Sequence, residues 1–202
     1  MRAASRMCRL VSIGVLAALV SVGLASAQET TVKGGLASSG IAFDREAYGV
    51  PDVDERRSGF VFGASIMPSG ADRGGWQIEA LVVQKGARNL LRRNDRFEFT
   101  YIEIPVLLHM DFWQKGDSGV FFVVGPSVAF NVQASYVDDG VREDIGDDIE
   151  KVDVGLNLGI GLELGRFVLE GRSNWGMRSA FTVDDVDFKH RTLLLTAGVR
   201  FR

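Results

Sequence analysis

The chain has 202 residues, with 23 Lys and Arg against 26 Asp and Glu, two histidines and one cysteine. This slightly acidic balance excludes the strongly basic surface that is typical of nucleic-acid binding. A single cysteine also excludes an internal disulfide framework and a multi-cysteine metal site.

The first 27 residues have the pattern of a secretory signal peptide. Arg2, Arg6 and Arg9 precede an uncharged run, residues 10–24, which ends in the small-residue triplet Ala25-Ser26-Ala27. A positive start, an apolar run and an A-x-A end are typical of a cleaved signal. The run is also short for the roughly 20 apolar residues that a transmembrane helix needs. We therefore predict a signal peptide over residues 1–27 and one domain over residues 28–202.

Apolar residues occupy every second position in seven segments of this domain, and a first segment, in which Leu36 stands between glycines and serines, completes eight. A period of two predicts β-strands, because an amphipathic helix repeats every 3.6 residues. Segments near 10 residues long match strands that cross a bilayer at a tilt of about 45°, whereas strands of soluble proteins average about 5–6 residues. In chain order the segments are 32–41, 60–66, 76–82, 102–110, 120–132, 152–164, 167–169 and 193–201.

The predicted connections alternate between long and short. The long ones are 44–57, 87–95, 134–151 and 178–190, and the short ones are 68–74, 111–118 and 165–166. Outer-membrane barrels have long external loops and short periplasmic turns. The pattern therefore predicts an all-β fold, an eight-stranded antiparallel up-and-down transmembrane β-barrel with both termini in the periplasm.

Two other folds are compatible with parts of this pattern. Residues 118–137 carry no charge, as a membrane helix would, but Pro126 and the alternation with Gly125, Ser127 and Asn131 favour a strand. A soluble barrel of lipocalin type has the same period with the apolar face turned inward around a ligand. Because the other face is rich in glycine as well as charge, we expect that face to line a narrow barrel interior.

The charged residues on that second face comprise five acids and four bases. An eight-stranded barrel is only wide enough for side chains to fill, and an unpaired charge inside it is costly. We therefore predict an ion-paired polar network that plugs the lumen, with no open pore. Its members are Lys33, Glu79, Lys85, Glu103, Asp153, Glu163, Glu170, Arg172 and Arg200.

The chain resembles the PorT-type outer-membrane β-barrel family in the stretches 79–86, 101–108, 125–126, 153–163 and 170–177. The resemblance implies an outer-membrane location and no known catalytic activity, with some relatives linked to secretion or gliding machinery. It also accounts for Pro105 and Pro126 within predicted strands. Because proline is disfavoured in strands except at edges and bulges, we expect a bulge at each.

Catalytic and metal-binding patterns are weak. Neither His109 nor His190 has a serine two residues away in a shared strand, as a nucleophile and base would require. The acidic stretch 138–150 does not have the ligand spacing of a twelve-residue calcium loop and is typical of a solvated loop. We expect no enzyme activity, no cofactor and no metal.

Four arginines in the second external loop are candidates for contact with lipopolysaccharide phosphates, because clustered arginines often bind phosphate. They are Arg88, Arg92, Arg93 and Arg96. The favoured hypothesis is a structural or partner-binding envelope component that engages lipopolysaccharide or envelope and secretion-complex proteins. The alternative is a small-ligand-binding or narrow transport barrel, lipocalin-like if soluble.

Overall fold

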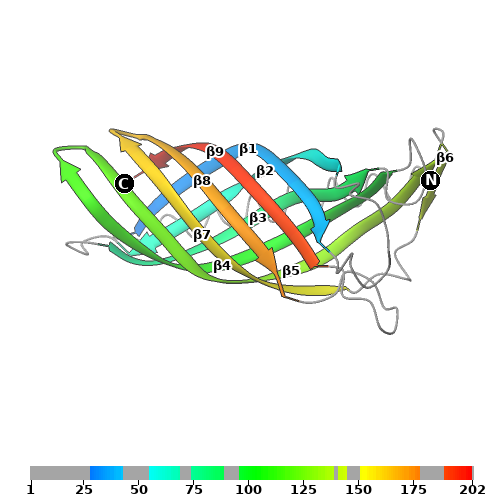
Figure 1. Ribbon diagram of the computed structural model, residues 1–202. Helices are drawn as coiled ribbons and strands as arrows, with labels where there is room; N and C mark the ends of the chain where they lie inside the picture. The colour runs from blue at the N-terminus through cyan, green and yellow to red at the C-terminus, as the bar shows by residue number, and fades with distance from the viewer. Residues whose placement is uncertain are drawn as a thin grey trace.

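The computed structural model describes residues 28–42, 55–68, 74–88, 96–138, 141–144, 151–177 and 189–201 (Figure 1). The predicted signal peptide lies outside these residues. The strands are β1 (Gln28–Ala42), β2 (Glu55–Pro68), β3 (Gly74–Arg88), β4 (Arg96–Lys115), β5 (Ser118–Asp138), β6 (Val141–Asp144), β7 (Val152–Leu164), β8 (Phe167–Gly176) and β9 (Lys189–Phe201). Within the described part of the chain, no helix has the length and apolar character needed to cross a membrane.

Eight of these strands close into one barrel. Each pairs antiparallel with its neighbours in the order β1-β2-β3-β4-β5-β7-β8-β9, and β9 pairs with β1 to complete the ring. The strands are strongly tilted around the barrel (Figure 1). The prediction of an eight-stranded antiparallel up-and-down barrel is confirmed. Strand β6 pairs only with the end of β5 among the described residues and takes no part in the ring.

The two ends of the barrel differ in their connections. Residues 69–73, 116–117 and 165–166 join strands at one end, which we call the short-turn end. Gly116 and Gly165 have φ values of 60° and 63°, a left-handed conformation that favours glycine and suits two-residue turns. The opposite end, with longer connections, is the long-loop end.

The alternation places aliphatic side chains on the outside of the barrel. Along β7, Leu156, Leu158 and Ile160 are exposed, whereas the residues between them are buried. Twenty-five large hydrophobic side chains of the described residues are 36–76% exposed, far more than the scattered apolar residues of a soluble surface. The apolar face therefore points outward, as in a membrane barrel, and the inward arrangement of a lipocalin is excluded.

The expected bulges at the two prolines are absent. Pro105 pairs in unbroken register with Ser127 on β5, and Pro126 pairs in unbroken register with Leu156 on β7. Each proline only interrupts the ladder to its other neighbour, β3 for Pro105 and β4 for Pro126, and the register is the same on both sides of each gap. A missing N–H removes a hydrogen bond without requiring an extra residue. The prediction of bulges there was wrong.

Register shifts lie elsewhere, between Arg56 and Val61, between Thr100 and Tyr101, and between Asp111 and Trp113. Several strands are also longer than their predicted segments. Strands β4 and β5 reach 20 and 21 residues, and β6 lies in a segment expected to be a loop. Pairing to a neighbour extends these strands into segments where the hydrophobic alternation is weak.

Candidate functional site

Many polar and charged side chains of the described residues are buried inside the barrel. All nine charged residues assigned to the lumen from alternation are 7% exposed or less. Eight of them meet in three groups along the barrel axis, and the ninth, Asp153 on β7, is buried in the interior as well. The centre, the long-loop half and the short-turn end each hold one group.

The central group is a quartet of Lys33 on β1, Glu79 on β3, and Glu170 and Arg172 on β8. Arg172 holds Glu79 at two points, with Nη1–Oε2 at 2.7 Å and Nη2–Oε1 at 2.9 Å, and it also pairs with Glu170. The Lys33 Nζ lies 2.5 Å from Glu79 and 3.1 Å from Glu170. Two acids and two bases neutralise one another, which is the condition for burying charge without a large cost.

The second group lies toward the long-loop end. Glu103 on β4 lies 3.1 Å from the Lys85 Nζ and accepts a hydrogen bond from the Asn174 amide nitrogen at 3.0 Å. The same nitrogen lies 3.1 Å from Asn157 Oδ1 and 3.2 Å from Ser127 Oγ. This group therefore joins strands from β3 to β8 through one buried carboxylate.

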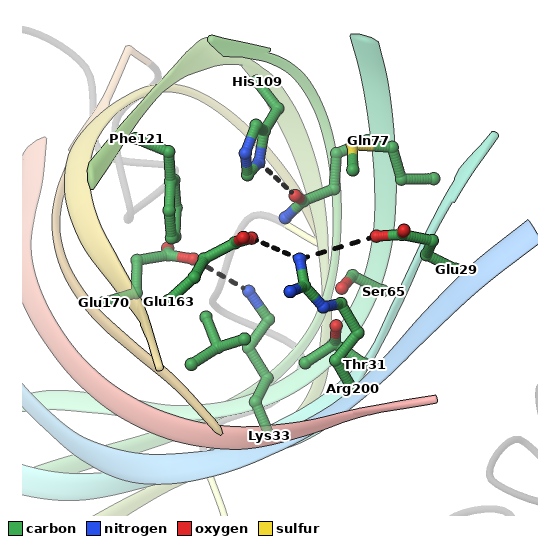
Figure 2. A pocket seen from close by; sticks show the side chains of 12 residues that line it. Glu29, Thr31, Lys33, Ser65, Gln77, His109, Phe121, Glu163, Glu170 and Arg200 are labelled. Atoms are coloured by element: carbon green, nitrogen blue, oxygen red, sulfur yellow. Dashed lines mark hydrogen bonds and ion pairs between the residues drawn. The ribbon is translucent and has the colours of Figure 1, made fainter. Parts of the chain in front are cut away.

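The third group lies at the short-turn end (Figure 2). Arg200 Nη1 lies 2.6 Å from Glu163 and 3.6 Å from Glu29, and Arg200 Nη2 donates to the carbonyl of Gly165 at 3.2 Å. Arg200 thereby connects the end of β9 to the β7–β8 turn and to the start of β1.

His109 lies in the same half of the lumen. Its ring nitrogens lie 3.0 Å from Gln77 Oε1 and 3.2 Å from Asp111 Oδ1, and its ring stacks on Phe121 with centroids 4.4 Å apart. Neither polar partner is a serine, threonine or cysteine, so this constellation lacks the hydroxyl or thiol nucleophile of a catalytic triad.

A small cavity lies between the central quartet and the Arg200 group (Figure 2). Its volume is about 20 Å³, which is room for roughly one water molecule. Lys33 and Glu170 border it on one side, and Glu163 and Arg200 border it on the other. The ion pairs on both sides of the cavity occupy the lumen at this level.

Apolar side chains fill other parts of the interior. A cluster from β1, β2, β3 and β9 contains Ala37, Val61, Leu81, Val83 and Leu194. A second cluster on β4 and β5 contains Leu107, Phe121 and Val123. The Phe121 ring lies over Gly161, where an added Cβ would be 2.1 Å from Cζ of the ring. A glycine at this position thus leaves the space that an aromatic side chain occupies.

The other predicted candidates are described only in part. Arg88 and Arg96 are register partners at the ends of β3 and β4, but their side chains, and all of Arg92 and Arg93, lie outside the described residues. His190 belongs to β9 and not to a loop. Among the residues that the structure describes, no group of three or more His, Cys, Asp or Glu side chains is arranged to hold a metal ion.

Sequence reasoning missed several buried polar residues that complete the network. Asn157, Asn174 and Ser127 have the lumen-facing alternation, so the same signal identifies them once uncharged residues are included. Arg57, which pairs with Glu98 at 3.0 Å, was placed in a loop. The alternation continues through this residue, with Ser58 and Phe60 exposed and Val61 buried, so extending the parity of the second segment toward its start identifies Arg57.

A closed antiparallel barrel with an aliphatic exterior and a charged interior defines a transmembrane β-barrel protein. Residues 26–182 match the family described as outer membrane protein beta-barrel domain. The chain belongs to this family, and its location is the bacterial outer membrane. A search of curated proteins found no match.

Solved structures with the same fold include proteins of different kinds. Neisserial surface protein A is 13% identical, with a TM-score of 0.50, over 85% of this chain and 97% of that one. Ail of Yersinia pestis, solved with the heparin analogue sucrose octasulfate, is 18% identical, with a TM-score of 0.47, over 87% and 99%. The outer membrane enzyme PagL is 10% identical, with a TM-score of 0.43, over 84% and 98%. At these identities the likeness concerns the fold alone.

Proposed function

We propose that the protein is a non-enzymatic component of the outer membrane with a plugged lumen, acting as a structural or partner-binding barrel. The observation that carries this proposal is the central quartet. Lys33, Glu79, Glu170 and Arg172 come from three strands and neutralise one another inside the ring. An ion that passed this level would have to separate them.

The energetics favour a permanent plug over a gate. Breaking a buried ion pair by removing one partner costs about 3–5 kcal/mol, and each member of the quartet has two partners of opposite charge. The neighbouring cavity holds about 20 Å³, which is too small for a ligand of several atoms. A larger hollow of about 340 Å³ lies at the short-turn end, bordered by Asp117, Gly165, Arg166, Arg200 and Phe201. The ion-paired quartet favours a plugged lumen over transport through the barrel.

Conductance in a planar lipid bilayer tests the plugged lumen. We expect no steady channels from the wild-type protein. A matched variant with alanine at all four quartet positions keeps the net charge unchanged, so any conductance that it gains comes from the lost seal. Steady wild-type channels of ion-passing size would contradict the proposal and favour narrow transport.

A hydrolase triad has no support at His109, because its ring contacts an amide and a carboxylate and no hydroxyl or thiol. We propose that the protein acts by binding, with lipopolysaccharide and envelope or secretion-complex proteins as its partners. Cross-linking in intact cells, followed by purification from the outer-membrane fraction, tests this. Recovery of the barrel with no reproducible protein or lipopolysaccharide partner would contradict it.

We also propose the finer assignment to the PorT-type group and an orientation with the short-turn end in the periplasm. The motif stretches around Glu79, Glu103 and Glu170 support the first. The short connections at 116–117 and 165–166 support the second, since such turns face the periplasm in outer-membrane barrels. Labelling of cysteines introduced at Asp117 and Lys151 with an impermeant reagent on intact cells tests the orientation, and only the Lys151 position should react.

A further inference from the structure

Two arginines stand on the outer wall of the barrel at its long-loop end. Arg56 on β2 and Arg191 on β9 are both exposed and flank β1, which pairs with both strands. Arg191 is the register partner of Gly40, and Arg56 Nη2 donates to the carbonyl of Ser38 at 3.2 Å. The Arg56 side chain therefore leans over β1, toward the strand that carries Arg191.

The pair lies at the boundary of the apolar belt. Leu193 is the next outward residue from Arg191 along β9, and Phe60 lies two outward positions from Arg56 along β2; both are exposed. Trp175 on β8 is the register partner of Arg191. Aromatic residues of this kind mark the level of the lipid headgroups in outer-membrane barrels. The two guanidinium groups are thus placed where the acyl chains end and the headgroups begin.

The local charge is positive and unopposed within the described part of the chain. None of the described outward side chains of β1, β2, β8 and β9 is an acid. No described carboxylate forms an ion pair with Arg56 or Arg191, unlike the buried Arg57 next in sequence, which pairs with Glu98. Two cations without a carboxylate partner among the described residues, placed at the headgroup level, favour an anionic lipid group.

The space between the two arginines suits one tetrahedral anion. Strands β2 and β9 are separated by two strand spacings, about 10 Å, so two extended arginine side chains can converge above β1. The outward residues of β1 at this level, Ser38 and Gly40, are small, so no bulky side chain of β1 stands between the two arginines. Guanidinium groups bind phosphate oxygens through two parallel hydrogen bonds, which gives geometric selectivity in addition to charge.

We propose that Arg56 and Arg191 form a cradle on the outer wall for a phosphate group of lipopolysaccharide in the outer leaflet. The inference rests on the lipopolysaccharide partner in the proposed function and names the residues and the chemical group of that contact. The cradle lies on the wall of the barrel, in line with the lipid headgroups, and is separate from the loop arginines considered from the sequence.

A binding titration tests the cradle. The protein, extracted in detergent, is titrated with fluorescent rough lipopolysaccharide and with the same material after removal of its lipid phosphates. We expect the Arg56→Ser/Arg191→Ser variant to bind the phosphorylated form roughly tenfold more weakly or worse, because it loses the charge-assisted hydrogen bonds to the phosphate. Binding of the dephosphorylated form should be weak and equal for wild type and variant.

A Lys151→Ser/Arg166→Ser variant is the matched control, because it removes two exposed positive charges away from the cradle. It should bind as the wild type does. Faster migration of the unboiled protein on a detergent gel checks that every variant is a folded barrel.

Three outcomes would overturn the cradle. The first is an unchanged affinity of the cradle variant, and the second is an equal loss in the control. The third is equal binding of both lipopolysaccharide forms by the wild type, which needs no variant at all. Failure of the wild type to bind lipopolysaccharide would remove this partner from the proposed function as well, whereas the plugged lumen is judged separately by conductance.

Discussion

Arg172 on β8 and Glu79 on β3 form a two-point ion pair across the barrel interior, with both guanidinium–carboxylate distances below 3 Å. The two residues are 93 positions apart in the chain, and neither strand pairs with the other in the sheet. The contact therefore bridges the lumen and ties opposite parts of the wall together. Lys33 and Glu170 complete the neutral group around it.

Replacing Arg172 with methionine should lower the free energy of unfolding by about 3–5 kcal/mol. The change leaves Glu79 and Glu170 to share the single charge of Lys33 in a buried site, and an uncompensated buried charge is strongly destabilising. Urea unfolding in detergent micelles, followed by tryptophan fluorescence, measures the loss. The double variant Glu79→Gln/Arg172→Met restores neutrality, so it should lose less than the sum of the single variants. Strict additivity would show that the two residues are not coupled.

Gly161 should be intolerant of even a methyl group. Its added Cβ would lie 2.1 Å from the Phe121 ring, and overpacking a filled interior costs typically 1–3 kcal/mol. Gly171 on β8 is the matched control, since an added Cβ there meets nothing within 4 Å. We expect Gly161→Ala to destabilise the barrel, Gly171→Ala to be nearly neutral, and Phe121→Leu to rescue Gly161→Ala. Equal effects of both alanines in urea unfolding would count against the packing described here.

A substitution at Leu158 tests whether the outward apolar face of the barrel contacts lipid acyl chains. It lies midway along β7 and is 50% exposed, so arginine at this position would face the centre of the lipid. A charged residue at the bilayer midplane costs about 2–4 kcal/mol, falling to about 0–1 kcal/mol near the interfaces. Unfolding in lipid vesicles should therefore show a much larger loss for Leu158→Arg than for Met177→Arg, beyond the end of β8. Similar losses would mean that Leu158 does not face acyl chains.

If the predicted signal peptide is cleaved after Ala27, the mature chain begins at Gln28. Intact-mass measurement of the protein from the outer-membrane fraction should give the mass of residues 28–202. An Ala27→Leu variant should accumulate as the uncleaved form, since signal cleavage requires small residues at this site. A wild-type mass that retains residues 1–27 would refute the signal peptide.

Local rules predicted much of the fold and part of the site. The alternation along residues 152–164 predicted strand β7, and extending the same parity to the other segments selected nine charged residues that the structure places inside the ring. The same rules failed at Pro105 and Pro126, where a general preference of proline for bulges was applied to positions whose register is regular. They also missed β6, because its short pairing with β5 has no hydrophobic signal.

The sequence by itself determined the number of barrel strands and which residues share a face, because side chains alternate strictly along an extended chain. Alternation alone did not determine which face points inward, since it is identical for a membrane barrel and for a lipocalin. The glycines on the charged face predicted the answer, and the closed ring, with its charged face buried and its aliphatic face exposed, confirmed it. Tertiary structure alone also decided the partners, such as Arg172 with Glu79 and Phe121 with Gly161, because these contacts join strands whose relative position depends on the register of the whole ring.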